Sequence, residues 1–220
     1  GFACRGLLEK NGNLIVNVEA RGQGRFLVNP STGESKQIEG QDGVGIAASS
    51  DGNIWTDFGV PSGGWGYTSI TKTSPDGVPM GPFLFQKKIN GAAWAILEEN
   101  PQRVLLGHAN GITIFNPQTG AATEWPADKN YPEFYATTVT FLNRDRAGHI
   151  WACTDQGLYQ LKPGGGLLAR YWSGGKGAWH LPYDNLYHFH EDAEGVFWIA
   201  TGGGGLIRWQ PPGEGSAQKD

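Results

Sequence analysis

The sequence predicts an all-β protein, a β-propeller of five four-stranded blades of about 46 residues each, on three observations. Glycine (35 residues) and proline (13) together make up 48 of the 220 residues, a composition that disfavours long helices. One sequence frame recurs along the whole chain. Each recurrence holds four short strand-like segments separated by turn residues, and this is the pattern of a propeller blade.

The recurring frame is clearest in the last two repeats. Residues Val139–Thr154 and Leu186–Thr201 share the pattern Asp-x-x-Gly-x-x-Trp-x-x-Thr, and a Gly-Leu pair follows each of them. One position on the second predicted strand anchors each repeat, at spacings of 40, 50, 46 and 47 residues. These anchors are Ile15, Trp55, Leu105, Trp151 and Trp198.

A second landmark keeps the same period. A proline-containing turn follows the third predicted strand of every repeat, with glycine close behind, as tight turns require. These prolines are Pro30, Pro75, Pro117, Pro163 and Pro211. Two landmarks that stay in phase five times predict five blades.

The frame has a structural explanation. The glycine after the acid permits the hairpin turn between the first two strands, and the acid can cap backbone amides of that turn. The tryptophan on the second strand can fill the space between neighbouring blades. We therefore expect Trp55, Trp151 and Trp198 to be core residues and not site residues.

The blades are expected in one continuous domain. Their approximate bounds are residues 1–40, 41–90, 91–136, 137–184 and 185–220. In the fourth repeat we expect strands at Thr138–Arg144, His149–Thr154, Leu158–Leu161 and Leu167–Trp172.

The last blade raises the question of closure. Only Glu214–Asp220 remain for its outermost strand, and this polar segment is a poor strand former. An unclosed propeller exposes strand edges. We therefore expect an open segment of a larger propeller, with a closed ring of five blades as the alternative.

Charge, hydropathy and cysteine content exclude several classes. A net charge of −4 offers no electrostatic footprint for nucleic acid, and the longest apolar run, Ala92–Leu97, is far shorter than a membrane span. We therefore expect no contact with nucleic acid or membrane. Cys4 and Cys153 fall in blades that are not neighbours, so we expect two free thiols.

No catalytic motif emerges from the sequence. A nucleophile elbow, a phosphate-binding Gly-Lys-Ser/Thr and a His-Glu-x-x-His are all absent. His188 and His190 share one face of a predicted strand and could form a two-ligand metal pair, but a polar stripe beside the central channel is the favoured explanation. We expect no enzyme activity, no cofactor and no metal.

The frame, preceded by His180-Leu-Pro-Tyr-Asp-Asn-Leu186, resembles the two-component regulator propeller repeat. That family has a glycine at the place of His180, whereas the positions that follow the family pattern are Leu181, Pro182, Asn185, Leu186, Asp192, Gly195, Trp198 and Thr201. The match is best in the last two repeats. The resemblance implies the periplasmic sensor part of a hybrid two-component system, often one for carbohydrate, without the family's kinase and regulator domains.

A second, looser resemblance concerns Asp51–Trp55, which looks like the repeat of streptogramin lyase propellers. That family uses a His/Glu/His constellation with a metal. The candidates here are His188, His190 and Glu191, which lie on a single predicted strand without a matching loop pattern.

The candidate binding residues follow from topology. Loops between second and third strands, and connections between blades, share one face of a propeller and vary in length here, and variable loops on a rigid scaffold usually carry binding. Exposed aromatic rings beside hydrogen-bonding groups suit stacking on sugar faces. The candidates are Trp65, His108, Asn110, Tyr131, Trp179, His180, Tyr183 and Asp184.

The sequence therefore favours a periplasmic or extracellular recognition propeller, the input part of a signalling protein. Its expected partners are a carbohydrate or other small polar ligand and the neighbouring blades or domains of a parent chain. The first alternative is a propeller scaffold for protein–protein contacts. The second is a streptogramin-lyase-like or glycan-active enzyme, which would need convergent titratable groups.

Overall fold

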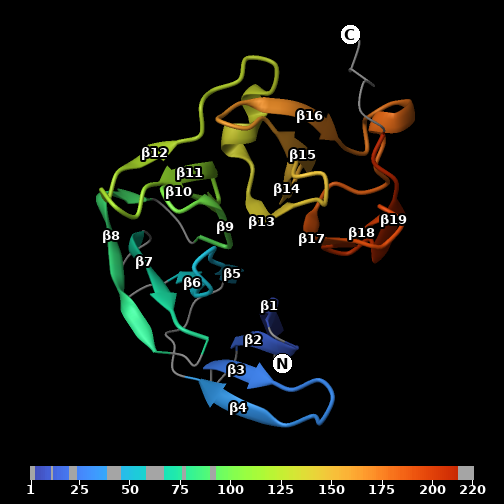
Figure 1. Cartoon of the computed structure of the whole chain (residues 1–220). Helices are drawn as coiled ribbons and strands as arrows, with labels where there is room; N and C mark the ends of the chain where they lie inside the picture. Colours follow the sequence, from blue (N-terminus) through green and yellow to red (C-terminus); the bar gives the residue numbers. More distant parts are fainter. Residues whose placement is uncertain are drawn as a thin grey trace. The chain divides into compact units, whose positions relative to one another are not determined.

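A computed structural model describes residues 3–10, 12–19, 24–38, 46–57, 67–75, 78–89 and 93–212. The described chain is almost entirely β-structure (Figure 1). It divides into two compact units. Unit 1 comprises residues 1–108 and 113–124, and unit 2 comprises residues 109–112 and 125–220.

Unit 1 holds three four-stranded antiparallel sheets, each with its strands in chain order. The first sheet contains β1 (Ala3–Lys10), β2 (Asn13–Glu19), β3 (Gly24–Val28) and β4 (Ser35–Ile38). The second contains β5 (Ile46–Ala48), β6 (Ile54–Asp57), β7 (Tyr67–Thr73) and β8 (Pro79–Ile89). The third contains β9 (Ala95–Asn100), β10 (Arg103–His108), β11 (Gly111–Phe115) and β12 (Ala122–Glu124), and β11 begins in the segment grouped with unit 2.

Unit 2 holds two further antiparallel sheets and two short 3-10 helices. The fourth sheet contains β13 (Val139–Arg144), β14 (Ile150–Thr154), β15 (Gly157–Leu161) and β16 (Leu167–Tyr171). The fifth contains β17 (Leu186–Glu191), β18 (Phe197–Thr201) and β19 (Leu206–Trp209), three strands within the described residues. The helices η1 (Pro132–Ala136) and η2 (Gly177–Trp179) lie in the connections before β13 and before β17.

These five meanders confirm the predicted β-propeller, and we number its blades 1 to 5 in chain order. The strands of blade 4 lie within one residue of the predicted bounds. The described residues contain no helix long and apolar enough to cross a membrane.

In blades 4 and 5 the aspartate of the repeated frame accepts hydrogen bonds from the frame's turn and from its tryptophan. In blade 4 the Asp145 carboxylate accepts the His149 amide at 2.8 Å and the Trp151 indole N–H at 2.8 Å. In blade 5 the Asp192 carboxylate accepts the Val196 amide at 2.9 Å and the Trp198 indole N–H at 2.7 Å. The acid therefore fixes the turn and also satisfies the one polar atom of the anchor tryptophan.

The anchor tryptophans differ in burial. Trp55 and Trp151 are 1% and 2% exposed, as expected for core residues. Trp198 is only half-buried, so its expected place in the core is wrong. The reason lies in the neighbouring blade: Phe197 and Trp209 of blade 5 pack edge-on against Trp151, at centroid distances of 5.2 Å and 6.0 Å. No further described blade of unit 2 covers Trp198 in this way.

Of the two cysteines, the structure describes the side chain of Cys153. Cys153 is a free, fully buried thiol on β14, and burial raises its pKa far above the ordinary range, so it is unreactive. The side chain of Cys4 lies outside the described residues.

Candidate functional site

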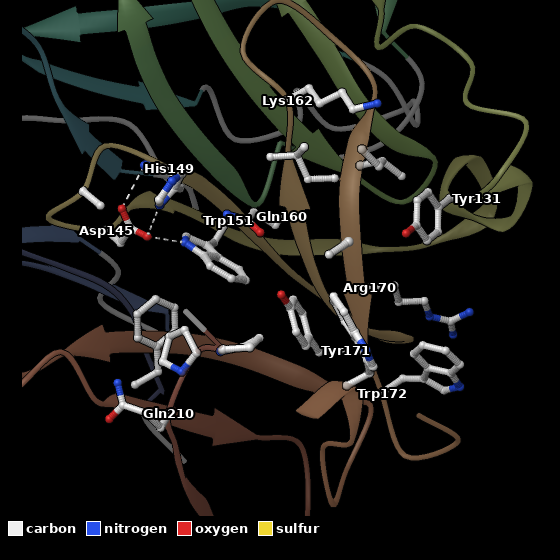
Figure 2. A pocket seen from close by; sticks show the side chains of 18 of the residues that line it. Tyr131, Asp145, His149, Trp151, Gln160, Lys162, Arg170, Tyr171, Trp172 and Gln210 are labelled. Carbon is white, nitrogen blue, oxygen red and sulfur yellow. Dashed lines mark hydrogen bonds and ion pairs between the residues drawn. The ribbon is translucent and has the colours of Figure 1, made fainter. Parts of the chain in front are cut away.

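The candidate site is a groove in unit 2, with a volume of about 1090 Å³ (Figure 2). It extends along β16 of blade 4 and is bordered by blade 5 through Phe197 and Gln210–Pro212. At its other end lie residues from the two blade connections, among them Tyr131, Trp172 and Trp179. We call this end the loop mouth of the groove.

Aromatic rings form the apolar part of the groove. Tyr171 of β16 is 3% exposed and stacks on Trp179, with ring centroids 5.1 Å apart and planes 23° apart. Its ring also meets Trp209 of β19 at 4.8 Å. Burial raises the pKa of the Tyr171 hydroxyl well above its usual range, so this group stays protonated and can donate a hydrogen bond.

Two of the polar side chains that line the groove are the hydroxyl of Tyr171 and the amide of Gln160 on β15. In Figure 2 both lie between the Asp145–Trp151 cluster and Arg170. A ligand in the groove therefore finds a donor at Tyr171 and a donor–acceptor pair at Gln160.

The loop mouth is organised by Arg170. Its guanidinium donates to Glu133 of η1 at 2.9 Å and to the Gln156 carbonyl at 2.9 Å and 3.1 Å. The same group lies over the rings of Tyr159 and Trp172, at 5.5 Å and 4.9 Å from their centroids. Arg170 thereby holds the Trp172 indole in a fixed position at the mouth.

The connection Ser173–Asn185 is held by its own hydrogen bonds. The Asp184 carboxylate accepts the Ser173 amide at 2.7 Å and the Ser173 hydroxyl at 2.6 Å. The Leu181 amide donates to the Trp172 carbonyl at 3.0 Å. Glycine is required at residue 175, because a Cβ there would come within 2.2 Å of the Trp179 carbonyl oxygen.

Only some of the predicted site residues line the groove. Tyr131 and Trp179 line the groove. His180 and Tyr183 are exposed in the Ser173–Asn185 connection but do not line it, and Asp184 is used in the loop contact with Ser173.

Of the remaining three predicted residues, the structure describes two, and neither lines the groove. Asn110 is exposed in the turn between β10 and β11. His108 is 5% exposed in unit 1, and its Nε2 atom lies 3.0 Å from the Thr113 hydroxyl. Burial lowers its pKa, so it is a neutral core residue and is not accessible to a ligand. Trp65 lies outside the described residues.

Several residues of the groove escaped sequence reasoning. Gln160, Arg170, Tyr171 and Trp172 lie on or next to the third and fourth strands of blade 4, whereas the sequence predicted binding residues in loops. The available signal was the run Ala169-Arg-Tyr-Trp172, in which a charged residue and two aromatic residues meet at the end of an outer strand.

The two histidines of β17, His188 and His190, were the candidate metal pair. His188 stacks on Phe141 with ring centroids 3.7 Å apart, and burial lowers its pKa, which favours the neutral ring. Across the described part of the chain, no group of three or more His, Cys, Asp or Glu residues is placed to hold a metal ion.

Comparison with known proteins identifies the class of fold. No family model and no curated protein matches the chain. Among solved structures, it is similar to the extracellular domains of two hybrid two-component system proteins of B. thetaiotaomicron, BT3049 (TM-score 0.65, 12% identity) and BT4673 (TM-score 0.60, 16% identity). The match to BT3049 covers 93% of this chain and 26% of that one. The match to BT4673 covers 89% of this chain and 25% of that one.

A third similar structure is PorZ, a surface component of the type-IX secretion system of Porphyromonas gingivalis. The TM-score is 0.64 at 21% identity, over 96% of this chain and 32% of PorZ. The chain thus spans between a quarter and a third of the length of these three structures. At these identities the similarity establishes the β-propeller fold and no particular function.

Proposed function

We propose that this chain belongs to an extracytoplasmic sensor, in which it binds a small polar ligand, such as a glycan, at the loop mouth of the groove. The observation that carries the proposal is the combination of aromatic faces with hydrogen-bonding groups at Tyr131, Arg170 and Trp172. Binding sites for small molecules are concave, largely apolar, and carry a few fixed polar groups.

The chemistry of the mouth suits a saccharide. A sugar ring presents an apolar face of C–H groups, which packs on a flat aromatic ring, and a rim of hydroxyls, which needs hydrogen bonds. Trp172 and Tyr131 are half-buried and offer the rings. Glu133 and Asn130 line the same end of the groove and offer the polar partners.

The sensor role has support from the fold. The two B. thetaiotaomicron structures are extracellular domains of two-component system proteins, and this chain has their fold. The role in signalling, and a location in the periplasm or outside the cell, are inferred by analogy.

We propose a binding role and not a catalytic one. Two acidic groups of the groove are already paired with basic ones: Asp145 with His149, and Glu133 with Arg170. A general acid or base must instead be free to exchange a proton with a substrate.

Titration with a glycan panel tests this proposal. We expect Trp172→Ala to weaken binding of the recognised glycan by roughly tenfold or more, which is the loss of a stacking anchor of about 1.4 kcal/mol. Tyr187→Ala is the matched control, because Tyr187 is 52% exposed and lies outside the groove. Unchanged affinity in the Trp172 variant would exclude the loop mouth as the site.

A second candidate function is contact with another polypeptide. It is favoured by the apolar part of the groove beside β16, away from the loop mouth.

A further inference from the structure

Two histidines lie next to each other on one face of β17, the first strand of blade 5. His188 pairs with Ala200 of β18 and His190 pairs with Trp198, and the register between these two pairs is regular. Residues two positions apart in a strand point to the same face, with their Cα atoms about 6.6 Å apart. The two imidazole rings therefore project from the sheet on the same side.

Both histidine side chains are accessible, and the residue between them is not. His188 and His190 are exposed, whereas Phe189 is 1% exposed and belongs to the core cluster shared by blades 4 and 5. This alternation is that of a strand with one buried face, and it fixes the direction of both imidazoles. Neither histidine lines the groove, so the pair is separate from the loop mouth.

The ring of His188 has a defined orientation. It stacks on Phe141 of β13, with ring centroids 3.7 Å apart and planes 29° apart. Stacking covers one face of an imidazole, whereas the two nitrogens lie at the edge of the ring, where they can bind an ion. Burial, and then the charge of His190, lower the pKa of His188, which favours the neutral ring. Neutral imidazole is the form that binds metal ions.

We propose that His188 and His190 together bind one divalent transition-metal ion, Cu²⁺ or Zn²⁺. Imidazole nitrogen suits these ions, whereas Mg²⁺ and Ca²⁺ prefer oxygen ligands. Each ring nitrogen must come within about 2.0–2.1 Å of a zinc ion. His188 is held by Phe141, and the exposed His190 side chain reaches the common ion by rotation about its side-chain torsions.

The pair supplies only part of a coordination shell. Zinc sites in proteins are mostly tetrahedral, and catalytic ones keep one position for water or substrate. Among the residues that the structure describes, no group of three or more His, Cys, Asp or Glu is placed to complete the shell. The positions that the two histidines leave open are therefore filled by water, or by oxygen or nitrogen atoms of a molecule that binds there. Such an ion adds a binding function to this face of blade 5.

This inference does not depend on the proposed ligand at the loop mouth. The metal pair uses β17, whereas the small ligand uses Tyr131 and Trp172. Trp172→Ala should therefore weaken glycan binding and leave metal binding unchanged. A failure of one proposal leaves the other standing, because the two are measured with different probes.

The test is a calorimetric titration of the full chain, prepared without an affinity tag, with Cu²⁺ and separately with Zn²⁺. We expect saturable binding of one ion per chain. His190→Asn should weaken the binding of both ions by roughly tenfold or more, because it removes one of the two ligands. A second readout is local: Trp198 lies opposite His190, so Cu²⁺ bound at the pair should quench its fluorescence. Trp198→Phe should reduce the quenching without weakening the binding.

His180→Asn is the matched control, because His180 is an exposed histidine of the same unit outside the pair. We expect its affinity for both ions to equal that of the wild type. His188→Asn also removes the stack on Phe141, so His190→Asn, which leaves that stack in place, is the deciding variant. Wild-type affinity in His190→Asn, or an equal loss in His180→Asn, would overturn the proposal. The absence of saturable binding, or a preference for Ca²⁺ or Mg²⁺ over Zn²⁺, would also contradict it.

Discussion

The buried indole N–H of an anchor tryptophan needs a hydrogen-bond acceptor. Blade 2 and blades 4 and 5 supply that acceptor in different ways. In blades 4 and 5 the indole N–H of the anchor tryptophan donates to an aspartate of its own turn, Asp145 or Asp192. In blade 2 the equivalent position, six residues before Trp55, is Ser49. The indole of Trp55 donates to Glu98 of blade 3 instead.

Glu98 does more than replace the missing aspartate. Its carboxylate also accepts the hydroxyls of Ser49 and Ser50 and, at 3.0 Å, the Ser50 amide. Glu191 occupies the same position in blade 5, seven residues before the anchor, and accepts the Arg146 amide of blade 4 at 2.7 Å. A glutamate at this position therefore ties a blade to the turn of the preceding one, and it accepts more hydrogen bonds where no aspartate of that turn bonds the anchor indole.

The largest expected effect is a difference in stability between variants of the two anchor tryptophans of unit 2. Trp151→Ala should destabilise the protein by about 3–5 kcal/mol, because it removes a buried ring that packs on Phe197 and Trp209. Trp198→Ala should cost clearly less, about 1–2 kcal/mol, because the ring is only half-buried. Urea denaturation measures both. Equal losses would show that Trp198 is covered as fully as Trp151.

The next largest effect is the loss of stability when Glu98 or Glu191 is removed. Glu98→Ala should cost about 1–3 kcal/mol, because it leaves the Trp55 indole without its acceptor together with three donors of the Ser49–Ser50 turn. Glu191→Ala should cost about 0.5–1.5 kcal/mol, since Trp198 and Trp151 keep their aspartates. In thermal melts, we expect the melting temperature to fall further for Glu98→Ala than for Glu191→Ala. A greater loss for Glu191→Ala would contradict the explanation.

A compensating change sharpens the same comparison. Ser49→Asp places an acid at the frame position of blade 2, but it adds a further negative charge beside Glu98 and Asp51. In the wild-type background we expect a loss of stability, whereas in the Glu98→Ala background we expect a gain of roughly 1 kcal/mol. A double-mutant cycle measures the coupling. Additive effects would show that the two carboxylates do not share the Trp55 indole.

The smallest effect is a dependence on pH. Burial acts to raise the pKa of Glu98, but hydrogen bonds from Ser49, Ser50 and Trp55 outweigh it and hold the pKa below its usual range. A lowered pKa means that Glu98 stabilises the fold above the ordinary glutamate pKa of about 4.3, and that this contribution is lost as the pH falls through the lower, folded-state value. The stability difference between wild type and Glu98→Gln should therefore be constant near neutral pH and shrink in acid. If the stability difference between wild type and Glu98→Gln grew in acid, it would contradict a lowered pKa for Glu98.

Much of the fold could be predicted from the sequence because its determinants are local. Asp145 and Asp192 reach the amides of their own turns, and the anchor tryptophan follows six residues later, so one short frame encodes a turn and the strand after it. Repetition of that frame then indicates the blade.

The candidate site was less predictable for a physical reason. Tyr131 and Trp179 were expected on variable loops, and they do line the groove. Arg170 and Trp172 were missed, because their importance comes from contacts with Glu133 and Gln156, which lie elsewhere in the sequence. Pairings over such separations leave no periodic trace in a single sequence.

The sequence alone determined the β-propeller class, the strands of blade 4 and the role of the acid–glycine–tryptophan frame, since each depends on residues within a few positions of one another. The tertiary structure alone decided which tryptophans are buried, which carboxylate accepts the Trp55 indole, and where a groove remains open. These properties depend on what the neighbouring blade presents. A side chain is buried or exposed according to the surface that packs on it, and that surface comes from a distant part of the chain.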